Sequence, residues 1–170
     1  LSILSLSLLA VSAASASDEP QDREISELET ITVTASADAS KGGLIPAFKG
    51  GQVARGSRVG ILGNKKNLES PFSNTAYTNR LIQDKHARSV GDVLQNDPTV
   101  RVARGYGNFQ ESYFIRGFAA ESDDTMYNGL YGILPRQYIA TELFERVEVQ
   151  RGASAFLNGM APGSNNIGGT

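Results

Sequence analysis

The sequence predicts an α+β domain with about four or five short strands and two or three short helices. Three local patterns favour this fold class. Valines alternate with polar residues over 145–152, which is typical of a half-buried strand. Ser89 and Asp92 have the spacing of a capping box, which begins a helix. Asn128-Gly129 is a strong signal for a tight turn between two strands.

The remaining elements follow from the same two periodicities. The expected strands are 72–77, 100–103, 113–116, 125–127 and 145–152. Thr78 is a candidate cap for a helix that runs to about residue 84, and Pro98 ends the helix that Ser89 begins. We expect ordered structure to begin near Ile61.

Composition limits the partners and the chemistry. The chain has 170 residues, a net charge of −2 at pH 7 and no cysteine. This small negative charge gives no reason to expect a nucleic-acid partner. The lack of cysteine excludes disulfides and thiolate metal sites.

The first sixteen residues carry no charge. Residues 1–11 form an apolar run about as long as the hydrophobic region of a signal peptide, and too short to span a bilayer. Ala14-Ser15-Ala16 then offers a cleavage site. We therefore expect 1–16 to be a signal peptide that lacks its basic start, and the mature protein to lie outside the cytoplasm. A buried helix is the alternative.

Residues 17–60 are expected to be flexible, because they are acidic at first and then rich in Gly, Ala, Ser and Lys. They contain one alternating heptapeptide, Glu29-Thr30-Ile31-Thr32-Val33-Thr34-Ala35. An extended peptide within a flexible stretch is typical of β-augmentation, in which it adds a strand to a partner's sheet. An ordinary polar linker fits the same pattern.

Motifs for catalysis are scarce. His86 is the only histidine, and its basic neighbours indicate a solvated surface position. No Gly-x-Ser-x-Gly elbow occurs, and the Gly-rich segment 104–108 lacks the ending of a phosphate-binding loop. Asp123-Asp124 is a weak signal for a cation, and a solvated loop explains it better. We therefore expect neither an enzyme nor a cofactor or metal site.

The strand at 145–152 carries charges at both ends of its apolar face. Glu145 and Arg151 bracket the two valines, and a buried charge without a partner is very costly. No obvious partner set lies nearby in the sequence. We therefore expect the partners of these charges to lie outside the chain.

Several segments together resemble the N-terminal plug domain of TonB-dependent outer-membrane siderophore receptors. The heptapeptide at 29–35 resembles the TonB box of that family. Ile115-Arg116-Gly117-Phe118 and the segment 145–152 match its two most recognisable plug motifs. The other matching segments are 58–64, 70–73, 97–100, 156–159 and 167–170. Their number and order make the resemblance specific over about residues 29–170.

The resemblance implies a plug domain over 61–170, with a mixed sheet of about four strands and short helices, lodged inside a 22-stranded β-barrel. The chain would then be a fragment that lacks the barrel. Residues 17–60 would be the periplasmic segment that carries the TonB box. Only about a dozen residues separate the expected cleavage site from Glu29, which leaves no room for an extra signalling domain.

In function, the resemblance implies import of a ferric-siderophore across the bacterial outer membrane. TonB, with its ExbB/ExbD energy complex, would pair with the box and pull on it. The siderophore brings its own iron, so the protein is not expected to supply metal ligands. A receptor for haem, cobalamin or a glycan is one alternative, and a free-standing secreted binding module is another.

The resemblance also assigns two kinds of site. Arg116 and Arg151 match plug arginines that pair with carboxylates of the barrel wall, and Glu145 and Glu148 match neighbouring acidic residues. Both arginines would then be exposed or only locally paired in this chain alone.

The second kind of site is the contact surface for the ligand. The candidates are Arg104, Tyr106, Phe109, Ser122, Asp123, Tyr131, Arg136, Gln137 and Tyr138. Arg104 has the spacing of a ligand-contacting arginine in hydroxamate-siderophore receptors, whereas Ser122 and Asp123 stand where the family has Gly-Gln. Packing of these loops against the barrel is the alternative role for each candidate.

Overall fold

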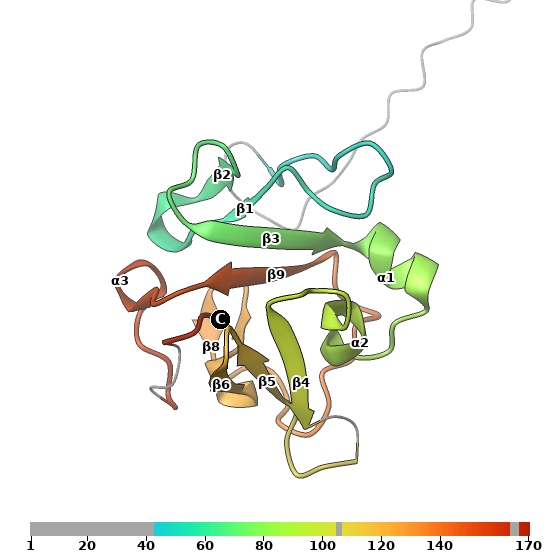
Figure 1. The fold of residues 1–170 in the computed structure, drawn as a ribbon, viewed down its shortest axis with the longest axis vertical. Helices are drawn as coiled ribbons and strands as arrows, with labels where there is room; N and C mark the ends of the chain where they lie inside the picture. Colours follow the sequence, from blue (N-terminus) through green and yellow to red (C-terminus); the bar gives the residue numbers. More distant parts are fainter. Residues whose placement is uncertain (1–42, 105–106, 164–166) are drawn as a thin grey trace, which may run out of the picture. The chain divides into compact units, whose positions relative to one another are not determined.

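The computed structural model describes residues 43–104, 107–163 and 167–170. They belong to one compact unit, Ala35–Thr170 (Figure 1). Its elements in order are β1 (Gly56–Arg58), η1 (Gly60–Leu62), β2 (Asn64–Lys66), β3 (Ser73–Thr78), α1 (Asn79–Lys85), α2 (Val90–Leu94), β4 (Val100–Arg104), β5 (Ser112–Ile115), β6 (Phe118–Glu121), η2 (Ser122–Asp124), β7 (Met126–Tyr127), β8 (Leu130–Tyr131), β9 (Arg146–Arg151) and α3 (Ala155–Asn158). Within the described residues, no helix has the length and apolar character needed to cross a membrane.

Strands β3 and β9 run side by side across the middle of the fold (Figure 1). They pair antiparallel, from Ser73 opposite Arg151 to Thr78 opposite Arg146. On the other edge of β9, Gln150 exchanges two backbone hydrogen bonds of 2.8 and 2.9 Å with Thr170. The strand expected from the alternating valines is therefore confirmed, and it is paired along both edges at its carboxyl end.

The other strands form small separate sheets. Strands β4, β5 and β6 make a three-stranded sheet, while β1 pairs with β2 and β7 pairs with β8. The expected α+β class is confirmed, but the sheet differs from the single mixed sheet of about four strands. Every pairing between the described strands is antiparallel. Short connections join the partners in the smaller sheets, whereas β3 and β9 are paired although they are distant in the sequence.

The hydrophobic core lies between the valine face of β9, the two helices α1 and α2, and the sheet of β5. Its members include Val149 from β9, Ile82 from α1, Val93 from α2 and Ile115 from β5. Ile139, from the long segment before β9, is fully buried in the same cluster. Burial of these side chains supplies the main driving force for the fold.

The start of α2 follows the local sequence signal. The side chain of Ser89 accepts a hydrogen bond from Asp92 N, and the side chain of Asp92 accepts one from Ser89 N. This reciprocal pair is the predicted capping box. Thr78 also occupies the cap position of α1, but its hydroxyl donates to the carbonyl of Gly51 instead of capping the helix.

Residues 43–58, which we name the N-terminal arm, correct the predicted start of ordered structure. Ala54 N donates to Ala76 O at 2.8 Å and Thr78 N donates to Gln52 O at 3.0 Å, so the arm lies along the free edge of β3. Ala54 is fully buried. The Gly- and Lys-rich composition suggested a flexible segment here, but pairing with a strand distant in sequence orders it.

Candidate functional site

Strand β9 makes a different set of polar contacts on each of its faces. Residues 147, 149 and 151 lie on one face and 146, 148 and 150 on the other, because side chains alternate along a strand. Arg151 reaches the turn that follows α2. On the opposite face, Gln150 accepts a hydrogen bond of 2.6 Å from Asn158 of α3. The charges of this strand therefore bind separate parts of the fold.

Arg151 is the centre of a buried polar network, the Arg151 network. Its guanidinium forms an ion pair with Asp97, and only 7% and 0% of the two side chains are exposed. Arg151 also donates to the hydroxyl oxygens of Thr99, at 2.6 Å, and Thr75, at 2.8 Å. The hydroxyl of Tyr77 donates to Asp97 Oδ2 at 2.9 Å. The buried charges are thus both paired and hydrogen-bonded, as a buried ion pair requires.

The expectation that Arg151 would be exposed or only locally paired is therefore wrong. Its partner Asp97 lies 54 residues away in the sequence, in the turn between α2 and β4. The loop segment 97–100 matched a family motif but gave no sign of this contact. A role for Arg151 against a barrel wall stays a prediction.

The network also fixes the protonation of two groups. Burial alone would raise the pKa of Asp97, but hydrogen bonds from Thr99 and Tyr77 and the charge of Arg151 lower it below the usual value. Burial, followed by the hydrogen bond to Asp97, raises the pKa of Tyr77 to about 12. Near neutral pH the network therefore holds an ionised carboxylate and a neutral phenol.

The other charged residues predicted to contact the barrel differ in their exposure and in their partners within this chain. Glu148 accepts a hydrogen bond of 3.0 Å from Arg58 N and lies 3.9 Å from Arg146, so its contacts are within this chain. Glu145 is exposed. Arg116 is exposed too, with a left-handed backbone at φ 53°, and within the described residues its side chain makes no hydrogen bond or ion pair.

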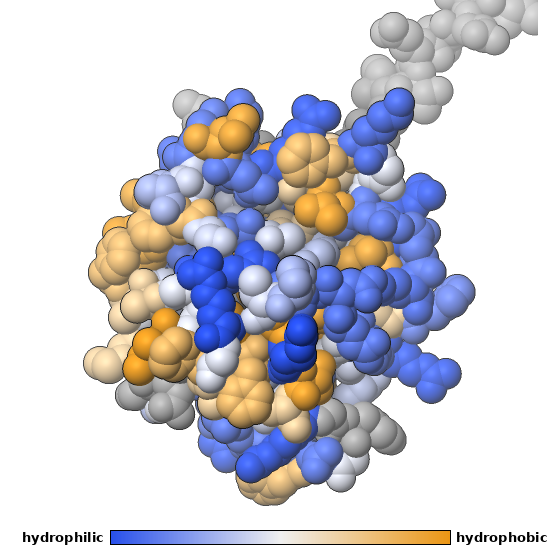
Figure 2. Space-filling model, viewed as in Figure 1, coloured by the Kyte–Doolittle hydropathy of each residue, from blue (hydrophilic) through white to orange (hydrophobic). Residues whose placement is uncertain are grey.

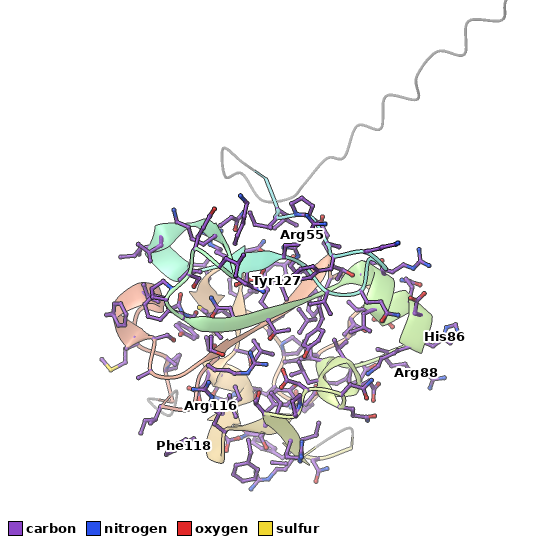
Figure 3. All side chains as sticks on the ribbon, turned by 45° about the horizontal axis from the view of Figure 1, so that its top comes forward. Arg55, His86, Arg88, Arg116, Phe118 and Tyr127 are labelled. Carbon is purple, nitrogen blue, oxygen red and sulfur yellow. The ribbon has the colours of Figure 1, made fainter. Side chains whose placement is uncertain are left out.

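Arg116 lies on the same side of the fold as Phe118, far from His86 and Arg88 at the end of α1 (Figure 3). Phe118 is half exposed, and a cavity of about 540 Å³ beside Arg116 is lined in part by Phe114 and Arg101. This surface combines aromatic rings with a cation that is free to pair. Arg116 and Glu145 are thus the two exposed members of the predicted ionic site.

Two of the predicted ligand contacts meet directly. Arg136 Nε lies 3.0 Å from Asp123 Oδ1, and Arg136 Nη2 lies 2.6 Å from Asp123 Oδ2, which makes a two-point ion pair at the surface. Ser122, the neighbour of Asp123 in η2, is buried. Among the described residues, no group of three or more His, Asp or Glu side chains is arranged to hold a metal ion.

The remaining ligand candidates are spread over the loops. Arg104 ends β4 and is exposed, as are Phe109 and Gln137. Tyr131 lies in the short strand β8, whose turn has positive φ at Asn128 and Gly129, as the predicted hairpin requires. Only part of the candidate set is therefore gathered in one place.

Tyr138 belongs to a different group of contacts around a cavity of about 590 Å³ beside α2 and β4. Its hydroxyl donates to Arg88 O at 2.6 Å. The same cavity is lined by Glu111, a buried residue that sequence reasoning missed. Glu111 accepts hydrogen bonds of 3.0 Å from both Gly91 N and Ile139 N, so its carboxylate joins three parts of the chain. No local sequence pattern marks this role.

Some predicted features lie outside the described residues. These are the signal peptide at 1–16, the TonB box at 29–35 and the ligand candidate Tyr106. His86 is described: it is exposed and caps α1 with a left-handed backbone at φ 50°.

The sequence was compared with those of known protein families. Residues 66–170 match the TonB-dependent Receptor Plug Domain family. The chain therefore belongs to the TonB-dependent receptor plug domain family.

Individual relatives are receptors. The ferrichrome receptor FcuA of Yersinia enterocolitica is 44% identical over 144 residues, which cover 83% of this chain and 19% of that protein. The ferric-pyoverdine BN7/BN8 receptor of Pseudomonas putida is 31% identical over 100 residues, covering 58% of this chain and 12% of that protein.

A solved structure agrees with the fold. The crystal structure of BauA, the ferric preacinetobactin receptor of Acinetobacter baumannii, matches with a TM-score of 0.67 and 45% identity. The match covers 71% of this chain and 18% of that protein. The matched residues therefore span less than a fifth of the length of each of these three relatives.

Proposed function

We propose that this chain is the plug of a bacterial outer-membrane receptor that imports a ferric-siderophore with energy delivered through TonB. The observation that carries the proposal is the 44% identity with a ferrichrome receptor over 144 residues. The 45% identity with a receptor for ferric preacinetobactin supports the same class of cargo. Iron is the cargo here, carried by its chelator.

In this proposal the cargo binds where β4 ends, at the loop around Phe109 and at η2. Arg104 and Arg136 donate hydrogen bonds to the oxygen atoms that surround the chelated ferric ion, since a guanidinium offers several donors in one plane. Their exposure in the plug supports this role. Phe109, which is exposed, contributes an apolar contact with the chelator.

In this proposal, the energy for transport is delivered to the N-terminal side of the plug, at the peptide 29–35. TonB pairs with the peptide at 29–35 by adding it as a strand to a sheet edge, and then pulls. The pull reaches the plug through the N-terminal arm, because the arm joins that peptide to the edge of β3. Rearrangement of the plug then opens a path for the cargo.

The cargo is tested by uptake in a strain that lacks its own siderophore receptors and expresses the intact receptor. We expect iron-dependent growth on at least one ferric-siderophore, with ferrichrome and preacinetobactin tested first. Replacing Arg104 with Ala should weaken uptake at low cargo concentration. Growth on haem, cobalamin or a glycan, with none on siderophores, would overturn the proposed cargo.

The TonB step is tested by a pull-down of the intact receptor with the periplasmic domain of TonB. Deletion of 29–35 should abolish capture, whereas deletion of 18–24, a stretch of equal length, should leave it intact. Capture that survives the loss of 29–35 would reject the role given to that peptide.

A further inference from the structure

Asp123 binds Arg136 with both of its carboxylate oxygens. Arg136 Nε lies 3.0 Å from Asp123 Oδ1, and Arg136 Nη2 lies 2.6 Å from Asp123 Oδ2. A carboxylate offers only acceptors, and the oxygen atoms around a chelated ferric ion are acceptors too. Asp123 is therefore not a hydrogen-bonding partner for such a cargo, whereas Arg136 is.

The backbone on both sides of this ion pair is fixed. Glu111 N donates to Arg136 O at 2.8 Å, and Glu111 is buried. On the other side, Glu121 N donates to Asp124 Oδ2 at 3.0 Å, which holds the short helix η2 that contains Asp123. Exposed ion pairs usually hold their side chains loosely, but a bidentate pair on ordered backbone is an exception. The pair therefore sets the orientation of the Arg136 guanidinium.

Arg136 keeps donors that Asp123 does not use. A guanidinium carries five N–H donors in one plane, and Asp123 takes one on Nε and one on Nη2. The others, including both on Nη1, meet no second acceptor among the described residues, and 54% of the side chain is exposed. Arg136 thus presents oriented donors at the surface.

The ion pair also changes the charge of the candidate ligand surface. The candidate contacts include two cations, Arg104 and Arg136, and one anion, Asp123. Asp123 offsets the charge of Arg136, so a polyanionic chelate gains little attraction there and meets a carboxylate that is 27% exposed. An uncharged chelate has acceptor oxygens to satisfy, and the remaining donors of Arg136 suit them.

We propose that Asp123 is a positioning residue that makes this plug selective for ferric chelates without net charge, such as trihydroxamates, over polyanionic ones, such as tricatecholates. It holds the Arg136 guanidinium ready for the oxygen atoms of the chelate, and it cancels the charge that would otherwise attract an anion. This inference rests on the proposed function, because it concerns the cargo of the same surface.

The experiment measures equilibrium binding of radioactive ferric chelates to the intact receptor in a bilayer. The probes are ferrichrome, a neutral trihydroxamate, and the ferric complex of a tricatecholate, a polyanion. Wild type should bind ferrichrome more tightly. Asp123→Asn should weaken ferrichrome binding, since Arg136 is no longer held, and strengthen tricatecholate binding, so the ratio of the two dissociation constants shifts by about tenfold or more. A folding defect would weaken both.

Three further variants separate the causes. Asp84→Asn removes a carboxylate from another exposed ion pair, 3.3 Å from Arg80 on α1, and should leave both affinities unchanged. Asp123→Glu keeps the charge and should keep tricatecholate binding weak. In an Arg136→Ala background, Asp123→Asn should no longer weaken ferrichrome binding, because no guanidinium is left to position.

The possible failures are distinguishable. Parallel loss of both affinities in Asp123→Asn, or no change in either, would overturn the role of Asp123, as would an equal loss of ferrichrome binding in the Arg136→Ala background. A wild-type receptor that prefers the tricatecholate would overturn the selectivity and leave ferric-siderophore import standing. Binding of neither chelate by wild type would instead overturn this inference together with the proposed class of cargo.

Discussion

Arg151 and Asp97 take two charges out of water, and only their mutual contact and the surrounding hydroxyl groups make that tolerable. Thr75 and Tyr77 come from β3, Asp97 and Thr99 from the turn before β4, and Arg151 from β9. One side-chain cluster therefore holds three segments that are distant in sequence. Single substitutions in it are expected to act on the whole core.

Asp97→Asn should be strongly destabilising, because it leaves the buried guanidinium of Arg151 without a counter-charge. We expect a loss of about 3–5 kcal/mol in the free energy of unfolding, measured from amide exchange along β3 and β9. Asp123→Asn is the matched control, since its ion pair with Arg136 is partly exposed and is worth less than about 1 kcal/mol. Equal effects would contradict the central place given to Asp97.

The lowered pKa of Asp97 also gives acid sensitivity a definite direction. A depressed pKa in the folded state stabilises the protein above the unfolded value of about 4, and this contribution is lost as pH falls through the folded-state pKa. Urea unfolding at a series of pH values below about 5 should therefore show a stability loss that Asp97→Asn reduces. If the free energy of unfolding falls equally with pH in wild type and in Asp97→Asn, then Asp97 is not the cause of the acid sensitivity.

At the scale of elements, local sequence signals predicted helix starts and turns correctly. They did not predict contacts between segments that are distant in the sequence. The capping box of α2 and the Asn128-Gly129 turn were predictable because each depends on residues a few positions apart. Thr78 was placed correctly as a cap position, yet its hydroxyl binds the carbonyl of Gly51 in the arm. That partner exists only after the arm has packed against β3.

The arm and the Arg151 network were missed for the same physical reason. The apolar residues at 43–58 do not alternate as they would in a strand, and four glycines and a proline interrupt or flank them, so the order of the arm comes from its pairing with β3. The partner of Arg151 lies in the turn between α2 and β4, and no spacing in the sequence encodes that contact. Among the candidate ligand contacts, the sequence indicated exposed residues such as Arg104. It did not indicate which candidates contact one another.

Glu111, like Asp97, is a buried carboxylate that links separate elements. It joins the start of β5 to α2 and to the segment before β9. Glu111→Ala leaves two buried N–H groups without acceptors, at Gly91 and Ile139. We expect a loss of about 2–6 kcal/mol, with a smaller loss for Glu111→Gln, which keeps one acceptor. Glu142→Ala, at an exposed position, should change the urea midpoint little.

At the scale of the whole molecule, the domain exposes many large apolar side chains. Figure 2 shows hydrophobic groups over α3 and beside the β4–β6 sheet, with hydrophilic groups between them. Phe156 and Met160 belong to the first region, and Phe114 and Phe118 to the second. Exposed apolar side chains gathered in one region favour contact with another surface. In the proposed receptor, we expect that surface to be the barrel.

Oxidation of methionine tests this contact. The chain has two methionines, and Met160 is 75% exposed in the domain whereas Met126 is half-buried. If the barrel covers α3, hydrogen peroxide should convert Met160 to the sulfoxide far more slowly in the intact receptor than in the urea-unfolded chain. A rate close to that of the unfolded chain would show that this face is open to water.

The division of contacts on β9 has a consequence for repeated use of the plug. If only the arm leaves, β3 remains as a finished template, and its exposed edge fixes the register in which the arm returns. Reannealing one short segment onto a standing strand is a local event, on the order of microseconds, comparable to closing a hairpin. A detached arm would then return to its place without refolding of the core.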